Sequence, residues 1–229
     1  IDLHYRHVLY LLNQIDGYEE SIEQLKIKIN HQYEMYLDKI GSYFSKSLEK
    51  KKEWSFLGEA PLNQFYNELQ RVSFKKMFVI ISDALRYEVA AELYENILMD
   101  NRLKGKAELA SMIAPVPSIT KVGMASLLPN KDLQYGSDVL VDGLSSNTTE
   151  GRNKILSNRN ATYAAIRYDN ISSMNRAEIR EFMKDKSLVY IYHNTIDTAG
   201  EHQESRVFGA SNEAMKEIQT LIVKLYQTL

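Results

Sequence analysis

The segment MFVIISDALRYE, residues 77–88, decides the fold class because an apolar run leads through a polar turn into a helix. Every residue of Met77–Ile81 is apolar, which is typical of a strand covered on both faces in a parallel sheet. Asp83 stands at the end of this run, and helical spacing of apolar residues continues over Tyr87–Leu98. The segment therefore predicts a strand, a turn with a carboxylate and a helix, the repeating unit of an α/β domain.

The same alternation of short apolar runs and helical patterns continues to the end of the chain. Further strands are expected at residues 107–114, 138–141, 161–167 and 188–192, and further helices at residues 119–128, 149–156 and 175–183. Ser211 is expected to cap a last helix. The sequence thus predicts a mostly parallel sheet flanked by helices over residues 73–229.

The preceding part, residues 1–72, has only helical patterns. Apolar residues spaced by threes and fours indicate one long amphipathic helix over residues 18–52, with a shorter helix before it, closed by Asp16-Gly17, and another after Pro61. Such a stripe is typical of a face that packs on a neighbouring domain or a partner helix rather than of a ligand site.

Composition excludes several classes of protein. The 28 Lys and Arg residues nearly balance the 30 Asp and Glu residues, so strong binding to nucleic acid through many phosphates is not expected. The absence of cysteine excludes thiol catalysis and Cys-based metal sites, and is consistent with a cytoplasmic protein. No signal peptide or membrane span is recognisable, and we expect no membrane contact. The helical pattern that continues to Leu229 suggests a piece of a longer chain.

In open α/β sheets, ligands bind beyond the carboxyl ends of the strands, so the polar residues there are the candidates for a site. Asp83 is one of them, although an Asp in this position also commonly caps the following helix. A second candidate is Thr120 in the segment PSIT, residues 117–120, where a helix N-terminus favours an anion. Here too, Ser118 or Thr120 could be an ordinary helix cap.

A third candidate segment is HNTIDTAGEH, residues 193–202, which gathers two imidazoles and two carboxylates after a buried strand. These are the donor groups that divalent metals use. His193 could instead be hydrogen-bonded at the strand end, and His202 could lie exposed in a loop before Ser211.

In the order in which they occur, these segments resemble the motifs of the alkaline phosphatase superfamily, particularly its phosphodiesterase and phosphomutase branches. The segment DALR, residues 83–86, resembles the motif whose Asp is a metal ligand after the first strand. Thr120, three residues after Pro117, resembles the nucleophile at a helix N-terminus. Asp197 with Gly200 resembles the second metal motif.

A more specific resemblance is to the PglZ family, phosphatase-like proteins of BREX phage-exclusion systems. Three segments carry it within roughly residues 65–229: FVIISDALRYE at 78–88, GMASLLP at 123–129 and YHNTID at 192–197. The resemblance implies an alkaline-phosphatase-like core, preceded here by the helical residues 1–72.

The resemblance also implies a site with two divalent metal ions. Zinc is the first expectation, and manganese and magnesium are the alternatives. Thr120 would be the nucleophile, Asp83 would bind the metal beside it, and Asp197 would bind the other. Glu201 occupies the position at which many branches have His, and His202 follows one residue later, so either residue could complete the site.

Two further residues have less specific implied roles. Arg86 could orient the loop or a phosphate, or form an ion pair with Glu88 or Glu92, and His193 could support the metal ligands from behind. The superfamily's next motif, an Asp-His pair after a further strand, has no counterpart here. We therefore expect the two-metal site of these residues to be incomplete and nearly inactive.

The expected function is that of a metal-dependent phosphoesterase in BREX-type phage defence. Its partners would be other proteins of the defence system, and its substrate a phosphoester or a nucleotide. The alternative is a non-catalytic, phosphatase-like scaffold that holds a defence complex together. The long helix at residues 18–52 and Glu201 favour the scaffold, whereas candidate residues after three separate strands favour the enzyme.

Overall fold

The computed structural model describes residues 1–50, 59–103, 107–202 and 207–229, except for the side chains of residues 201 and 202. The chain forms two compact units, Ile1–Leu57 and Gly58–Leu229. The described part of the first unit is helical, and the second unit contains the sheets.

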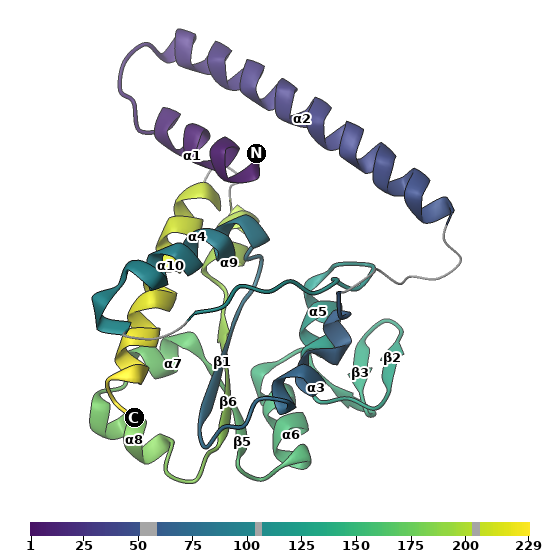
Figure 1. The fold of residues 1–229 in the computed structure, drawn as a ribbon, viewed down its shortest axis with the longest axis vertical. Helices are drawn as coiled ribbons and strands as arrows, with labels where there is room; N and C mark the ends of the chain where they lie inside the picture. Colours follow the sequence, from purple (N-terminus) through teal and green to yellow (C-terminus); the bar gives the residue numbers. More distant parts are fainter. Residues whose placement is uncertain (51–58, 104–106, 203–206) are drawn as a thin grey trace. The chain divides into compact units, whose positions relative to one another are not determined.

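The described part of the first unit has two helices, α1 at Asp2–Leu12 and α2 at Glu19–Glu49, as the apolar spacing predicts (Figure 1). Gly17 in the turn between them has φ of 80°, a left-handed angle that glycine adopts without strain. The rings of Tyr5 and Tyr33 stack with their centroids 3.7 Å apart, so the two helices pack against each other. No residue of α2 is buried.

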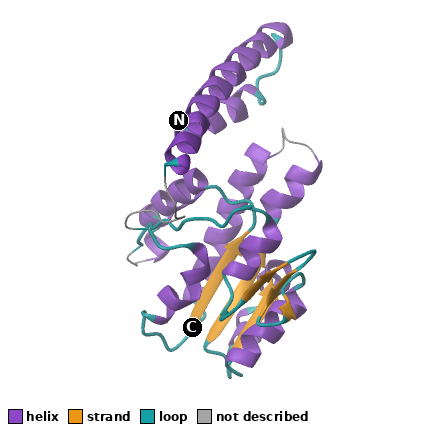
Figure 2. Cartoon of the chain, turned by 90° about the vertical axis from the view of Figure 1, so that its right-hand side faces the viewer, coloured by secondary structure: helices purple, strands orange, loops and turns teal. Residues whose placement is uncertain are grey.

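The centre of the second unit is a parallel sheet of three strands in the order β1-β6-β5 (Figure 2). These strands are β1 at Met77–Ser82, β5 at Tyr163–Arg167 and β6 at Leu188–His193. All six residues of β6 are buried, as expected for a middle strand with helices on both faces. The predicted α/β class with a parallel sheet is confirmed.

Alternate residues of β1 face two different helical layers. Val79 lies in the core under one layer, whereas Ile80 packs toward the other. The first layer consists of η1 at Leu62–Gln64, α3 at Phe65–Gln70, α5 at Thr120–Ser126 and α6 at Thr149–Arg159. The second consists of α4 at Tyr87–Met99, η2 at Asn101–Leu103, α7 at Tyr168–Ser173, α8 at Arg176–Phe182 and α10 at Val207–Tyr226, with α9 at Thr195–His202 beside α10.

A small antiparallel sheet extends the first layer. It consists of β2 at Leu133–Tyr135, β3 at Val139–Val141 and β4 at Leu144–Ser145. The valines at both ends of β3 are buried in the same core as β1, so the short strand expected there is confirmed. Within the described ranges, every helix is too short or too polar to span a lipid bilayer.

The strand predicted at residues 107–114 is wrong. Only Ile113 pairs, in an isolated bridge with Pro61, through hydrogen bonds from Leu62 N–H to the Ile113 carbonyl and from Ile113 N–H to the Ala60 carbonyl. The pairing does not extend into a ladder, because Leu62 begins the 3-10 helix η1 and Pro115, whose N–H would make the next bond, has none. Most of the remaining residues of the segment are exposed.

The prediction that Ser211 caps the last helix is also wrong. Helix α10 begins at Val207, and the Ser211 hydroxyl donates a hydrogen bond to the Val207 carbonyl at 2.9 Å from inside the helix. The compact units divide at Leu57 and Gly58, earlier than the expected boundary at residue 72. The physical reason is Tyr66, which is buried in the same core as β1 and β6.

Leu156→Ala should lower the free energy of unfolding by about 2–5 kcal/mol, because Leu156 is fully buried between α6 and the sheet and its truncation leaves a cavity. Lys154→Ala, at an exposed position of the same helix, should change it by less than about 0.5 kcal/mol. Hydrogen exchange of the β6 amides of the full-length protein, followed as a function of urea concentration, measures the free energy of unfolding of both variants. Equal losses would contradict the packing described here.

Candidate functional site

Asp83 lies directly beyond the carboxyl end of β1, in a turn fixed by the backbone. Its N–H donates a hydrogen bond to the His193 carbonyl at 2.8 Å, which continues the pairing of β1 with β6. Its Oδ1 accepts a hydrogen bond from Ala84 N–H at 3.0 Å, and Ala84 has a left-handed φ of 60°. The N-cap of α4 is Arg86, so Asp83 does not cap that helix.

Thr120 is the first residue of α5 and is exposed. The N-cap residue is Ile119, and no side chain caps the helix, so neither Ser118 nor Thr120 has the ordinary capping role that was the alternative. The side chain of Thr120 instead lies close enough to the Asp83 carboxylate to lower the pKa of Asp83. The hydroxyl thus faces the end of β1.

Asp197 lies in the first turn of α9 and is half-buried. Burial raises the pKa of the Asp83 carboxyl, and the negative charge of Asp197 raises it further. The hydrogen bond from Ala84 N–H, the nearby Thr120 side chain and the positive charge of Arg152 act against this rise in pKa. The structure therefore brings Asp83, Thr120 and Asp197 together, although they are far apart in the sequence.

Arg152 of α6 is a member of this cluster that the sequence analysis missed. Its Nε donates to the Ser146 carbonyl at 2.7 Å, and its guanidinium lies 4.4 Å from the ring centre of Tyr192 in β6. The hydroxyls of Ser146 and Tyr192 are buried, and neither has a hydrogen-bond partner among the residues that the structure describes. No local pattern distinguishes Arg152 from the other charged residues of α6, so only the fold identifies it.

His193, at the end of β6, is fully buried and joins four elements. Its Nδ1 lies 2.9 Å from Ser82 Oγ of β1, and its Nε2 lies 2.8 Å from Glu217 Oε2 of α10. The Thr195 hydroxyl of α9 donates to the same Glu217 oxygen at 2.7 Å. This arrangement corresponds to the hydrogen-bonded strand end that was one alternative for His193, and it fixes the start of the helix that carries Asp197.

The remaining predicted residues are not part of the described cluster. Arg86 is exposed at the N-cap of α4. Glu201 and His202 belong to the last turn of α9 and not to a loop, but their side chains lie outside the described residues. Their roles, like that of Arg86, stay predictions.

The donor set partly fits a divalent cation. Asp83 and Asp197 offer carboxylate oxygens, which hard and borderline divalent ions accept as ligands, and the repulsion between them would be relieved by a positive ion. No group of three or more His, Asp or Glu residues with the arrangement of a metal site occurs among the described side chains. The described part of the chain thus offers two candidate ligands.

Comparison with known proteins identifies the family to which the chain belongs. The family model for the "BREX system PglZ alkaline phosphatase-like domain" matches residues 62–229. The second unit is accordingly an alkaline-phosphatase-like domain. The chain belongs to the PglZ family.

Two curated relatives have similar sequences along nearly the whole chain. The "Alkaline phosphatase-like protein PglZ" of Bacillus cereus (strain H3081.97) is 35% identical over 239 aligned residues, with 100% of this chain and 28% of the relative covered. The "Alkaline phosphatase-like protein BrxZ" of Escherichia coli O9:H4 (strain HS) is 34% identical over 233 aligned residues, with 96% of this chain and 25% of the relative covered. The chain thus spans about a quarter of the length of these relatives. No solved structure matches it significantly.

Glu217→Ala should lower the free energy of unfolding by about 1–3 kcal/mol, because it leaves the buried His193 Nε2 and the Thr195 hydroxyl without their shared partner. Glu213→Ala, at an exposed position of the same helix, is the matched control and should change it by less than about 0.5 kcal/mol. Urea denaturation of the full-length protein provides the comparison. A Glu217 variant as stable as the Glu213 variant would show that the network does not hold this edge of the sheet together.

Proposed function

We propose that the protein is a metal-dependent phosphoesterase of a BREX-type phage-defence system, with Thr120 as the nucleophile. One observation carries the proposal: the Thr120 side chain, the Asp197 carboxylate and the Arg152 guanidinium all lie close enough to Asp83 to shift its pKa. A hydroxyl, two carboxylates and a guanidinium are the groups that phosphoryl transfer to an alcohol requires. Membership of the PglZ family supports the same reaction class.

In this proposal the residues of the chain have separate tasks. Asp83 lies beside Thr120 and would accept a hydrogen bond from its hydroxyl, which would orient the Thr120 oxygen toward the phosphorus. Asp83 and Asp197 would hold a divalent cation, with zinc as the first expectation. When bound, the cation supplies the positive charge that makes the Thr120 hydroxyl acidic enough to attack. Glu201 or His202 would add a further ligand.

Arg152 would neutralise charge on the phosphate. Its guanidinium is held by the Ser146 carbonyl and the Tyr192 ring, so it is oriented before any substrate arrives. The unpartnered hydroxyls of Ser146 and Tyr192 support a polar group bound beside it, because buried hydroxyls are normally hydrogen-bonded. The substrate class is a phosphoester or a nucleotide, and other proteins of the defence system are the expected partners.

A scaffold without catalytic activity is the second candidate function. It is favoured by α2, a helix of 31 residues none of which is buried, with apolar residues such as Ile27 and Tyr43 more than half exposed. A long apolar surface of this kind suits an interaction with another protein. In this alternative the cluster around Thr120 would be retained without turnover.

Thr120→Ala and Asp83→Ala should each lower the phosphoesterase activity of the full-length protein by at least about a thousandfold, because they remove the nucleophile and the group that orients it. Hydrolysis of mono- and diester substrates, with divalent metal and with EDTA, measures the effect. Both residues lie outside the hydrophobic core, so the variants should remain folded.

Ser118→Ala and Asp185→Ala are the matched controls, since they remove an exposed hydroxyl and an exposed carboxylate elsewhere. Phage protection by the same variants separates the two candidate functions. Full protection by a folded double variant of Thr120 and Asp83 would favour the scaffold, and metal-dependent turnover by that variant would show that the nucleophile is misassigned.

Arg152→Ala should lower kcat/KM by about a hundredfold, because the charge that faces the phosphate is lost. Lys154→Ala removes an exposed cation from the same helix and should leave kcat/KM unchanged. Steady-state kinetics of the full-length protein measures kcat/KM of both variants. Equal activity of the two variants would exclude Arg152 from the site.

A further inference from the structure

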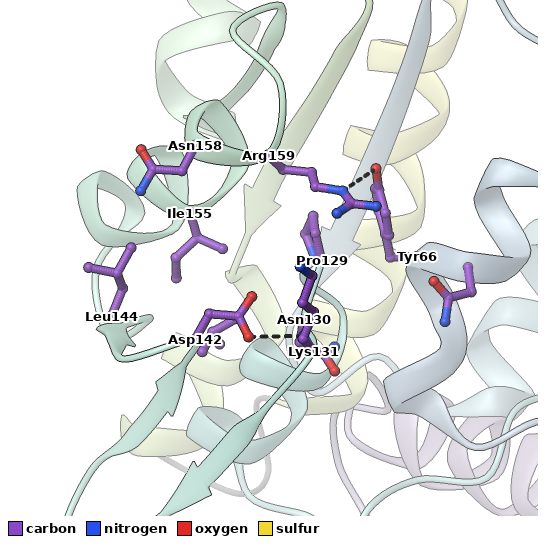
Figure 3. Close-up of a pocket in the computed structure, with 11 residues that line it drawn as sticks. Tyr66, Pro129, Asn130, Lys131, Asp142, Leu144, Ile155, Asn158 and Arg159 are labelled. Atoms are coloured by element: carbon purple, nitrogen blue, oxygen red, sulfur yellow. Dashed lines mark hydrogen bonds between the residues drawn. The ribbon is translucent and has the colours of Figure 1, made fainter.

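The second unit contains a cavity of about 560 Å³ that is separate from the cluster around Thr120 (Figure 3). It lies between α3, the segment after α5, the small antiparallel sheet and the second half of α6. Tyr66 in its wall packs edge-on against Tyr163, at the amino end of β5. The cluster around Thr120 lies beyond the opposite, carboxyl ends of β1 and β6.

Helix α6 reaches both places. Arg152, near its start, acts on Asp83, whereas Arg159, at its end, lines the cavity. Seven residues of helix separate the two arginines by roughly 10 Å along the axis. The cavity is therefore a second place at which a small molecule could bind.

The floor of the cavity is apolar and preformed. It includes Tyr66, Val141 and Ile155, each at least 95% buried. A volume of this size lies within the range of roughly 300–1,000 Å³ that is usual for ligand pockets. A flat apolar group can therefore be buried there without any change of the core.

The rim of the cavity is positively charged. Arg159 donates from Nε to the Tyr66 hydroxyl at 3.4 Å, and among the described residues its two terminal nitrogens have no hydrogen-bond partner. The Lys131 ammonium, also on the rim, forms no ion pair with a described residue. Among the described residues, Asp142 is the one acidic residue of the lining, and its Oδ1 already accepts hydrogen bonds from the N–H groups of Lys131 and Asp132.

We propose that this cavity binds a small organic anion that joins a flat apolar ring to a phosphate or carboxylate, of the kind that a mononucleotide represents. The ring lies on the apolar floor, and the anionic group accepts hydrogen bonds from Arg159, whose planar fork suits a phosphate or carboxylate. Lys131 adds a second positive charge, and the Asn158 amide offers a polar contact at the rim. The proposal is independent of any catalysis at Thr120.

Isothermal titration of the full-length protein with adenosine 5′-monophosphate tests this binding. EDTA is present throughout, so that a metal-dependent reaction cannot consume the probe. We expect saturable binding of the nucleotide, and at least tenfold weaker binding of adenosine alone or inorganic phosphate alone, since each has only half of the required chemistry.

The double variant Lys131→Gln, Arg159→Gln should weaken nucleotide binding at least tenfold, and Asn158→Trp, which fills the mouth of the cavity from an exposed position, should do the same. Lys154→Gln, at an exposed position of α6 outside the cavity lining, should bind as tightly as the unchanged protein. Thermal unfolding verifies that the variants fold.

Three results would overturn the proposal. They are the absence of saturable nucleotide binding up to about 10 mM, binding that both cavity variants retain in full, and binding that Arg152→Gln abolishes. The last result would assign the nucleotide to the cluster around Thr120.

Discussion

The parallel register of β1 and β6 is the constraint on which the candidate site depends. Ser82 pairs with His193, and the N–H of Asp83 continues the ladder to the His193 carbonyl. Because carboxyl ends of parallel strands meet at one edge, this register puts Asp83 beside the chain that enters α9 and so beside Asp197. A shift by one residue would turn alternate side chains of β1 to the other helical layer and separate the polar residues from one another.

Two further side chains, those of His193 and Arg152, stabilise the arrangement of the Asp83 and Asp197 carboxylates at this edge of the sheet. His193, buried between Ser82 and Glu217, ties β1, β6 and α10 together, so the backbone behind the carboxylates is fixed. The charge of Arg152 offsets part of the repulsion that raises the pKa of Asp83. An arrangement of charged groups that is fixed in advance is what electrostatic stabilisation of a transition state requires. At the opposite end of α6, the same fold places Arg159 on the positively charged rim of the cavity.

The strands of the parallel sheet and most helices of the second unit could be predicted because their patterns are local, whereas β2 and β4 were not predicted. The apolar runs at residues 77–81 and 188–192 are typical of strands covered on both faces, and the polar residues after them include Asp83 and Asp197. Features that depend on tertiary contacts could not be predicted: the bridge of Ile113 with Pro61 that does not become a strand, the burial of Tyr66, and the place of Ser211 inside α10. Arg152 belongs with these, because its relation to Asp83 arises only when α6 packs on the sheet.

The central claim is that Asp83, Thr120 and Asp197 form one metal-binding site at the edge of the sheet. A crystal structure of the full-length protein grown with manganese, with anomalous diffraction measured at the manganese absorption edge, tests it most directly. We expect an anomalous peak in contact with carboxylate oxygens of both Asp83 and Asp197, with the Thr120 hydroxyl facing it. Peaks only at other residues, or the two carboxylates separated by a strand's length of about 17–20 Å, would contradict it.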